Sequence, residues 1–99
     1  MRNLLLAAAI LLPAAAGAQS PEIARGGEIA QTWCSSCHQV SATAPTKDTI
    51  PGFPEIARRP TTTADRLRGF LRQPHGRMPN FELSDANINP LVAYILSLK

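Results

Sequence analysis

Two cysteines and a histidine stand together in the run Cys34-Ser35-Ser36-Cys37-His38, and the chain has no other cysteine. Two thiols three positions apart can each add to one of the two vinyl groups of a porphyrin, and a histidine directly after the second thiol then lies under the iron. The run therefore predicts one covalently attached haem c, with Cys34 and Cys37 in thioether bonds and His38 as an axial ligand of the iron.

One methionine besides the initiator offers a second axial ligand. Met78 lies three positions after His75 and directly before Pro79, on a connection that follows a predicted helix. Because a thioether sulfur stabilises reduced iron, His/Met ligation suits electron transfer. We predict that Met78 fills the sixth position. Two alternatives remain: His75 could be the ligand instead, or Met78 could fill core space and leave the sixth position open.

The N-terminal residues have the pattern of an export signal. Arg2 precedes an apolar stretch at 4–12, and small residues at 16–18 form an A-x-A cleavage site. The apolar stretch is shorter than the roughly 20 residues of a spanning helix, although an uncleaved membrane anchor is the alternative. We predict a cleavable signal peptide at 1–18, a single domain at 19–99, a periplasmic location and no membrane span after cleavage.

Size and charge exclude some functions. A domain this small has a marginal core without a staple, and a covalent haem would supply apolar surface for the core. Ten Lys and Arg against seven Asp and Glu, with no basic tract that interleaves aromatics, argue against nucleic acid as a partner. Most arginines are expected on solvated helix faces, and one or two could pair with a haem propionate. The sequence does not choose among Arg58, Arg59, Arg66, Arg68, Arg72 and Arg77.

The first half of the domain predicts one helix, over residues 21–33. Ser20 is a suitable cap before the proline at the first helical position. Gly26 and Gly27 weaken this helix by roughly 1 kcal/mol each relative to alanine. They indicate either a close approach of another helix or a break at this point.

The middle of the chain predicts an ordered loop followed by a helix. Residues 39–60 are rich in Ser, Thr, Pro and Gly, and we expect them to cover the haem edge, with a short helical turn at 54–58. Thr62 and Asp65 have the spacing of a capping box. The helix that they open would carry on one face Leu67, Phe70 and Leu71.

The C-terminal segment has the period of a helix, with apolar residues on one face at Leu91, Tyr94, Ile95 and Leu98. Its start has two solutions because Pro90 cannot donate a backbone hydrogen bond. The helix could begin at Ser84-Asp85 and kink near Asn89, or a turn could precede a shorter helix from Pro90. The chain shows no convincing strand pattern, so the fold class is all-α.

The haem motif at 34–38, the pair Met78-Pro79 and the helical run 91–95 together resemble the small class I c-type cytochromes of the bacterial periplasm. This resemblance covers residues 19–99 and implies the cytochrome c fold, in which three main helices and short turns surround one haem. One departure is that residues 87–90 replace the acidic-aliphatic start of the family's last helix.

The resemblance also implies particular contacts. The first and last helices would cross at Gly26 and Tyr94, and the Pro51 carbonyl would accept the second ring N–H of His38. Ala30 stands where many relatives have an aromatic residue, so Trp33 or Ile29 would supply that packing.

These features predict a monomeric electron-transfer protein that shuttles single electrons and is not an enzyme. Its partners would be periplasmic redox proteins, such as a dehydrogenase, an oxidase or a bc-type complex, which dock transiently at the haem edge near Cys37. One alternative is a bound cytochrome subunit of a dehydrogenase complex. Another is a haem protein with an open or labile sixth site that acts as a gas sensor or peroxidase-like enzyme.

Two other classes use similar residues without haem. A thiol–disulfide oxidoreductase also has a C-x-x-C sequence, but it needs a thiolate of lowered pKa and a thioredoxin-like scaffold with strands. A structural zinc site could draw on Cys34, Cys37, His38 and His75, although adjacent residues are poor joint ligands and the spacing matches no common finger. Neither alternative is favoured.

Overall fold

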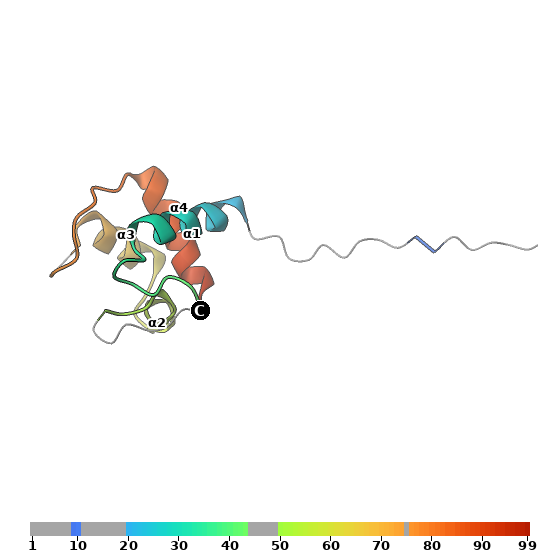
Figure 1. The fold of residues 1–99 in the computed structure, drawn as a ribbon, viewed down its shortest axis with the longest axis horizontal. Helices are drawn as coiled ribbons and strands as arrows, with labels where there is room; N and C mark the ends of the chain where they lie inside the picture. Colours follow the sequence, from blue (N-terminus) through green and yellow to red (C-terminus); the bar gives the residue numbers. More distant parts are fainter. Residues whose placement is uncertain (1–8, 11–19, 44–49, 75) are drawn as a thin grey trace, which may run out of the picture.

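The computed structural model describes residues 9–10, 20–43, 50–74 and 76–99. These segments contain no strand and four helices, shown in Figure 1: α1 (Pro21–Trp33), α2 (Phe53–Arg58), α3 (Ala64–Arg72) and α4 (Asp85–Ser97). The all-α prediction is confirmed, with three longer helices and one of six residues. The predicted signal peptide lies outside the described residues except for 9–10. No helix in the described segments is long and apolar enough to cross a membrane.

Helix α1 has the predicted bounds. The Ser20 side chain accepts a hydrogen bond from the Ile23 amide at 3.2 Å, which satisfies one of the four amides that begin a helix without a partner. The helix runs unbroken through Gly26 and Gly27. The alternative in which these glycines break the helix is therefore wrong.

The two glycines instead permit α1 and α4 to cross in close contact. A Cβ atom at Gly26 would lie 2.6 Å from the Pro90 carbonyl carbon and 2.7 Å from the Tyr94 Cβ, distances at which real carbon atoms do not pack. At Gly27 a Cβ would lie 3.1 Å from the edge of the Tyr94 ring. The crossing that the resemblance implies at Gly26 and Tyr94 is confirmed.

Helix α4 begins at Asp85 and continues through Pro90, so the shorter helix starting at Pro90 is wrong. The Ser84 carbonyl accepts from the amides of both Asn87 and Ile88 at 2.9 Å, which closes the first turn before the proline. Pro90 deprives the Ala86 carbonyl of its helical partner, but Ala86 is exposed and water can hydrate that oxygen.

Helix α3 begins one residue later than the predicted capping box. The cap is Thr63, whose side chain accepts from the Arg66 amide at 3.2 Å. The Thr62 hydroxyl instead donates to the Ile56 carbonyl at 2.7 Å and ties the start of α3 to α2. On the predicted apolar face of α3, Leu67 and Leu71 are buried, but Phe70 is 41% exposed.

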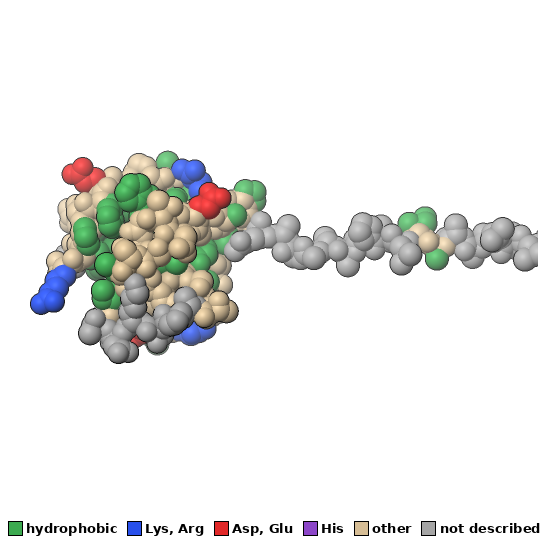
Figure 2. Space-filling view, in the orientation of Figure 1, with side chains coloured by type: hydrophobic (Ala, Val, Ile, Leu, Met, Phe, Trp, Pro, Cys, Tyr) green, Lys and Arg blue, Asp and Glu red, His purple; other side chains and the backbone are tan. Residues whose placement is uncertain are grey.

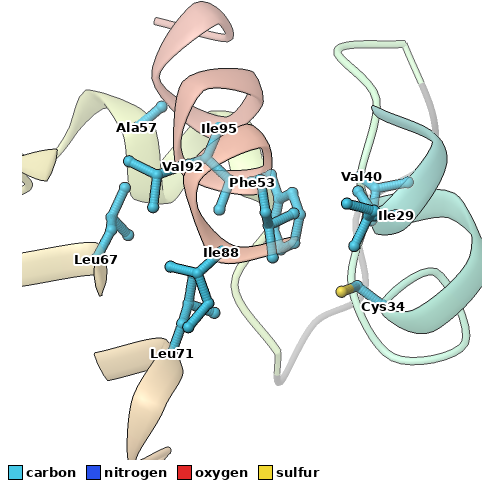
Figure 3. Close-up of a cluster of buried hydrophobic side chains, with 12 residues drawn as sticks. Ile29, Cys34, Val40, Phe53, Ala57, Leu67, Leu71, Ile88, Val92 and Ile95 are labelled. Atoms are coloured by element: carbon cyan, nitrogen blue, oxygen red, sulfur yellow. The ribbon is translucent and has the colours of Figure 1, made fainter. Parts of the chain in front are cut away.

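All four helices contribute to one cluster of buried side chains, together with the segment that follows α1. Figure 3 shows Ile29, Cys34 and Val40 on one side of this cluster and Leu67, Leu71 and Ile88 on the other. Ile29 of α1 is buried here, whereas Trp33 is half exposed. Of the two residues expected to replace the packing of an aromatic at position 30, Ile29 is therefore the one that lies in the core.

Candidate haem centre

The residues of the haem motif form a single turn at the C-terminal end of α1. The Cys34 amide still donates to the Ala30 carbonyl at 2.9 Å, so Cys34 closes the helix. Its own carbonyl accepts from the amides of Cys37 at 3.2 Å and His38 at 2.8 Å. The two thiols and the imidazole are thus held on one short, hydrogen-bonded piece of backbone.

The two cysteines differ in environment, since Cys34 is buried in the hydrophobic cluster and Cys37 is exposed. In Figure 3 the Cys34 sulfur points toward the side of the cluster formed by Ile88 and Leu71. This placement fits a large apolar group that is attached through both sulfurs and enclosed on one side only.

The ionisation of Cys34 argues against thiol–disulfide exchange. Burial, and to a lesser extent the charge of the neighbouring Cys37 thiolate, raises the pKa of the Cys34 thiol to about 11. An exchange cysteine requires the opposite shift, because the thiolate is the nucleophile. Cys34 in the polypeptide without haem is therefore a protonated thiol at neutral pH.

His38 is oriented by a backbone carbonyl. Its Nδ1 lies 2.7 Å from the Pro51 oxygen. A carbonyl oxygen can only accept, so Nδ1 carries the proton and the neutral ring has its lone pair on Nε2, the atom that can ligate iron. The ring of Phe53 packs at a centroid distance of 5.2 Å and an interplanar angle of 45°, which restricts rotation of the imidazole.

Two residues that sequence reasoning missed hold Pro51 in place. The Gln39 backbone carbonyl accepts from the Phe53 amide at 2.8 Å. The buried Gln39 side chain donates to the Ser41 carbonyl at 3.1 Å. A Cβ at Gly52 would lie 2.8 Å from the Gln39 Oε1, so glycine lets the two segments touch. The one sequence signal was a glycine directly after the proline.

Met78 lies on the connection between α3 and α4. It is half buried and packs against the same hydrophobic cluster that contains Cys34. The Asn80 side chain accepts from the Glu82 amide at 2.9 Å and shapes the turn after Met78, where Glu82 has a positive φ of 52°. The rival ligand His75 lies outside the described residues.

Several of the candidate propionate ligands already have partners. Ion pairs join Arg59 to Glu55 at 3.5 Å, Arg68 to Asp65 at 3.1 Å and Arg72 to Asp85 at 2.9 Å. Arg59 and Arg66 also line an open hollow of about 450 Å³ between α2 and α3, with Phe70 in its wall. The structure therefore does not single out one arginine of the described residues as the propionate ligand.

An all-helical domain with a C-x-x-C-H turn after its first helix and a carbonyl-bound histidine is a small c-type cytochrome. The family model described as cytochrome c oxidase, cbb3-type, subunit III matches residues 21–95. The cytochrome c-552 of Bradyrhizobium diazoefficiens is 37% identical over 83 residues, which cover 83% of this chain and 80% of that protein. No solved structure matches.

The chain therefore belongs to the cbb3-type family of c-type cytochromes. Its cofactor is haem c with its iron, bound covalently, and its function is electron transfer. The residues at the site fit that cofactor: the Cys34 thiol lies in the apolar cluster and the Met78 thioether packs against it. His38 packs on Phe53 of the same cluster with its Nε2 available, and the exposed Cys37 lies on the same turn as Cys34.

Proposed function

We propose that the protein is a periplasmic carrier of single electrons, with His38 and Met78 as the two axial ligands and Cys34 and Cys37 as the thioether attachments. The observation that carries this proposal is the 2.7 Å contact between His38 Nδ1 and the Pro51 carbonyl. It directs the basic nitrogen away from the protein backbone and raises its basicity as a ligand.

The haem supplies a one-electron iron couple, and the protein sets how that couple behaves. The turn at 34–38 and the Pro51 carbonyl orient His38, while the hydrophobic cluster excludes water from the buried side of the site. With a sulfur ligand in the sixth position, no substrate can reach the metal, so the protein turns over no substrate of its own.

The residues at 1–18 support export to the periplasm. The periplasm oxidises free thiols, and cysteines held in thioether bonds to haem are protected from that oxidation. The electron donor and acceptor would be a periplasmic dehydrogenase, an oxidase or a bc-type complex. A carrier that cycles between two partners must dissociate quickly, and small interfaces with fast release suit that requirement. We expect the carrier itself to be a monomer.

One observation favours a second role. The description of the matching family model names an oxidase subunit. This description supports the alternative of a cytochrome bound within a larger complex. Size-exclusion chromatography of the native protein from detergent-solubilised whole cells separates the two. A free carrier elutes at the size of one small domain, whereas a bound subunit remains with its complex.

The test of the ligand set is the visible spectrum of the holoprotein, oxidised and reduced, with and without carbon monoxide. We expect a low-spin reduced spectrum, a long-wavelength sulfur–iron charge-transfer band when oxidised, and no response to carbon monoxide. The variant Met78→Ala should lose that band and bind carbon monoxide. Leu83→Ala is the matched control, since Leu83 is also half buried against the cluster on the same connection.

Two outcomes would contradict the proposal. A low-spin spectrum without the sulfur band, which His75→Ala converts to high spin, would make His75 the ligand. A high-spin wild-type protein that binds carbon monoxide would favour gas sensing or peroxidase-like activity.

A further inference from the structure

Two large aromatic side chains meet on the surface of the domain. Trp33 is 51% exposed and Phe81 is 39% exposed, and their ring centroids lie 5.9 Å apart at an interplanar angle of 55°. Single exposed hydrophobic residues are ordinary, but adjacent exposed aromatics are enriched where proteins bind one another. Each ring partly covers the other, yet much of both remains in contact with water.

This pair lies next to the haem centre along both segments of the chain. Trp33 directly precedes Cys34, and Phe81 follows Met78 by three residues. Beside the two rings is a hollow of about 100 Å³, whose wall also includes Leu83, Asn87 and one charged residue, Glu82. We call the three hydrophobic residues Trp33, Phe81 and Leu83 the aromatic patch.

The surroundings of the aromatic patch carry little charge. Residues 29–43 contain no Asp, Glu, Lys or Arg, and neither do residues 78–81. The nearest charges along the second segment are Arg77 and Glu82, which have opposite signs. Arg25 reaches the rim of the hollow, where its guanidinium donates to the Asn87 side chain at 3.0 Å. Figure 2 shows one face of the domain, on which hydrophobic side chains are dispersed among uncharged surface and only a few charged side chains appear.

We propose that the aromatic patch is the docking surface for the redox partner, and that the partner presents an apolar, nearly uncharged face with one side chain entering the hollow. The inference rests on the proposed function, because it assigns the surface through which electrons leave. A strongly acidic or basic partner would find no complementary cluster of charge here, whereas apolar surface would be buried against tryptophan, a residue enriched at binding hot spots.

The probe is a second copy of the holoprotein, because the aromatic patch is itself a surface of the chemistry proposed for the partner. Mixtures of oxidised and reduced protein exchange electrons, and broadening of the haem NMR lines measures the second-order rate. We expect this rate to change by less than about twofold between about 10 mM and about 500 mM NaCl, since docking without charge is not screened.

Two charge variants and one control test the surface. Trp33→Glu places like charges opposite each other when two copies meet, and it should slow exchange by about tenfold at low salt, with partial recovery at high salt. Phe81→Glu should do the same, and it lies on a different segment of the chain from the attachment turn, which keeps the test open should Trp33→Glu impair haem loading. Thr61→Glu adds the same charge at an exposed residue on the other hollow and should leave the rate within about twofold of wild type.

The outcomes separate this inference from the proposed function. If both glutamate variants at the aromatic patch exchange as fast as wild type while all spectra stay low-spin, the docking surface is wrong and the carrier role stands. A wild-type electron-exchange rate that rises steeply with salt would also overturn the proposed docking surface, because the contact face would then be charged. A high-spin protein that binds carbon monoxide overturns the carrier role and the docking surface together.

Discussion

Helix α4 contacts α1 and α3 in two different ways. Against α1, backbone meets backbone, since Gly26 lies on the Pro90 carbonyl. Beyond the end of α1, the Tyr94 hydroxyl donates to the Val40 carbonyl at 2.6 Å. Against α3, the polar contacts are at the surface, where Arg72 pairs with Asp85 at 2.9 Å and Arg68 donates to Asn89 at 3.0 Å.

The difference shows which contact must be rigid. Helix α1 ends in the turn that carries both cysteines and His38, so the α1–α4 crossing determines where those residues lie relative to the core. Close backbone contact leaves no room for adjustment. Exposed pairs of long side chains can break and re-form, and the α3–α4 contact should therefore tolerate change.

The largest expected effect is at the crossing. Gly26→Ala would place a methyl group against the Pro90 carbonyl and the Tyr94 Cβ. The gain in helix propensity of about 1 kcal/mol is smaller than the overpacking cost of about 3 kcal/mol, and we expect a net loss of about 2 kcal/mol in the free energy of unfolding. Guanidinium chloride unfolding of the oxidised holoprotein measures it. A loss below about 1 kcal/mol would mean that the helices separate easily.

The hydrogen bond of Tyr94 should have the next largest effect. Tyr94→Phe leaves the Val40 carbonyl without its 2.6 Å donor, and we expect a loss of about 1–2 kcal/mol in unfolding free energy. The same denaturant titration at neutral pH measures it. Ser97→Ala is the control, because that hydroxyl bonds only within the exposed end of α4. Equal effects for both variants would argue against a structural role for the Tyr94 bond.

The same residue predicts a pH dependence. Burial raises the pKa of the Tyr94 phenol above its usual value near 10. Folding then favours the neutral phenol, so this contribution to stability is complete below the unfolded pKa and is lost as the pH rises through the folded pKa. Wild type should lose more stability than Tyr94→Phe between about pH 9 and about pH 12. Parallel curves for the two proteins would show that Tyr94 is not the group responsible.

A glycine of α3 offers the matched opposite of Gly26. A Cβ at Gly69 would meet no atom within 4 Å. Gly69→Ala should therefore show the propensity gain alone and stabilise the protein by up to about 1 kcal/mol. Both the melting temperature and the unfolding free energy from denaturant titration should rise in Gly69→Ala. If Gly69→Ala destabilises the protein, α3 is more tightly packed than its exposure indicates.

The smallest effect is expected at the ion pair between α3 and α4. Both side chains are half exposed or more, so Arg72→Gln should cost less than about 1 kcal/mol. Raising the salt concentration should lower the unfolding free energy of wild type toward that of the variant, because screening weakens an ion pair that only wild type has. A large, salt-independent loss would mean that the aliphatic part of Arg72 packs against α4.

Features that depend on neighbouring residues could be read from the sequence. The bounds of α1, its Ser20 cap, the short helix before residue 59 and the haem motif all follow from spacing within a few positions. Capping, helix periodicity and thioether attachment are local chemistry, so residues nearby in the chain carry the whole signal.

Predictions failed where a residue outside the spacing pattern of a helix contacts one of its groups. The hydroxyl of Thr62 is taken by Ile56 of α2, which leaves the cap of α3 to Thr63. Gln39 and Gly52 could not be identified as supports of Pro51, because their contact joins segments separated by a loop. The surface contact between Trp33 and Phe81 could not be predicted for the same reason, since no residue near Trp33 in the sequence indicates that Phe81 packs against it.

The spacing of residues in the chain thus predicted an all-helical c-type cytochrome, and it predicted Cys34 and Cys37 as the attachment residues. Packing between distant segments established which side of each helix is tight, which residues support Pro51 behind His38 and which aromatic rings remain at the surface. The reason is one of range: capping and helix propensity act over a few residues, whereas contact between helices depends on the shape of both partners.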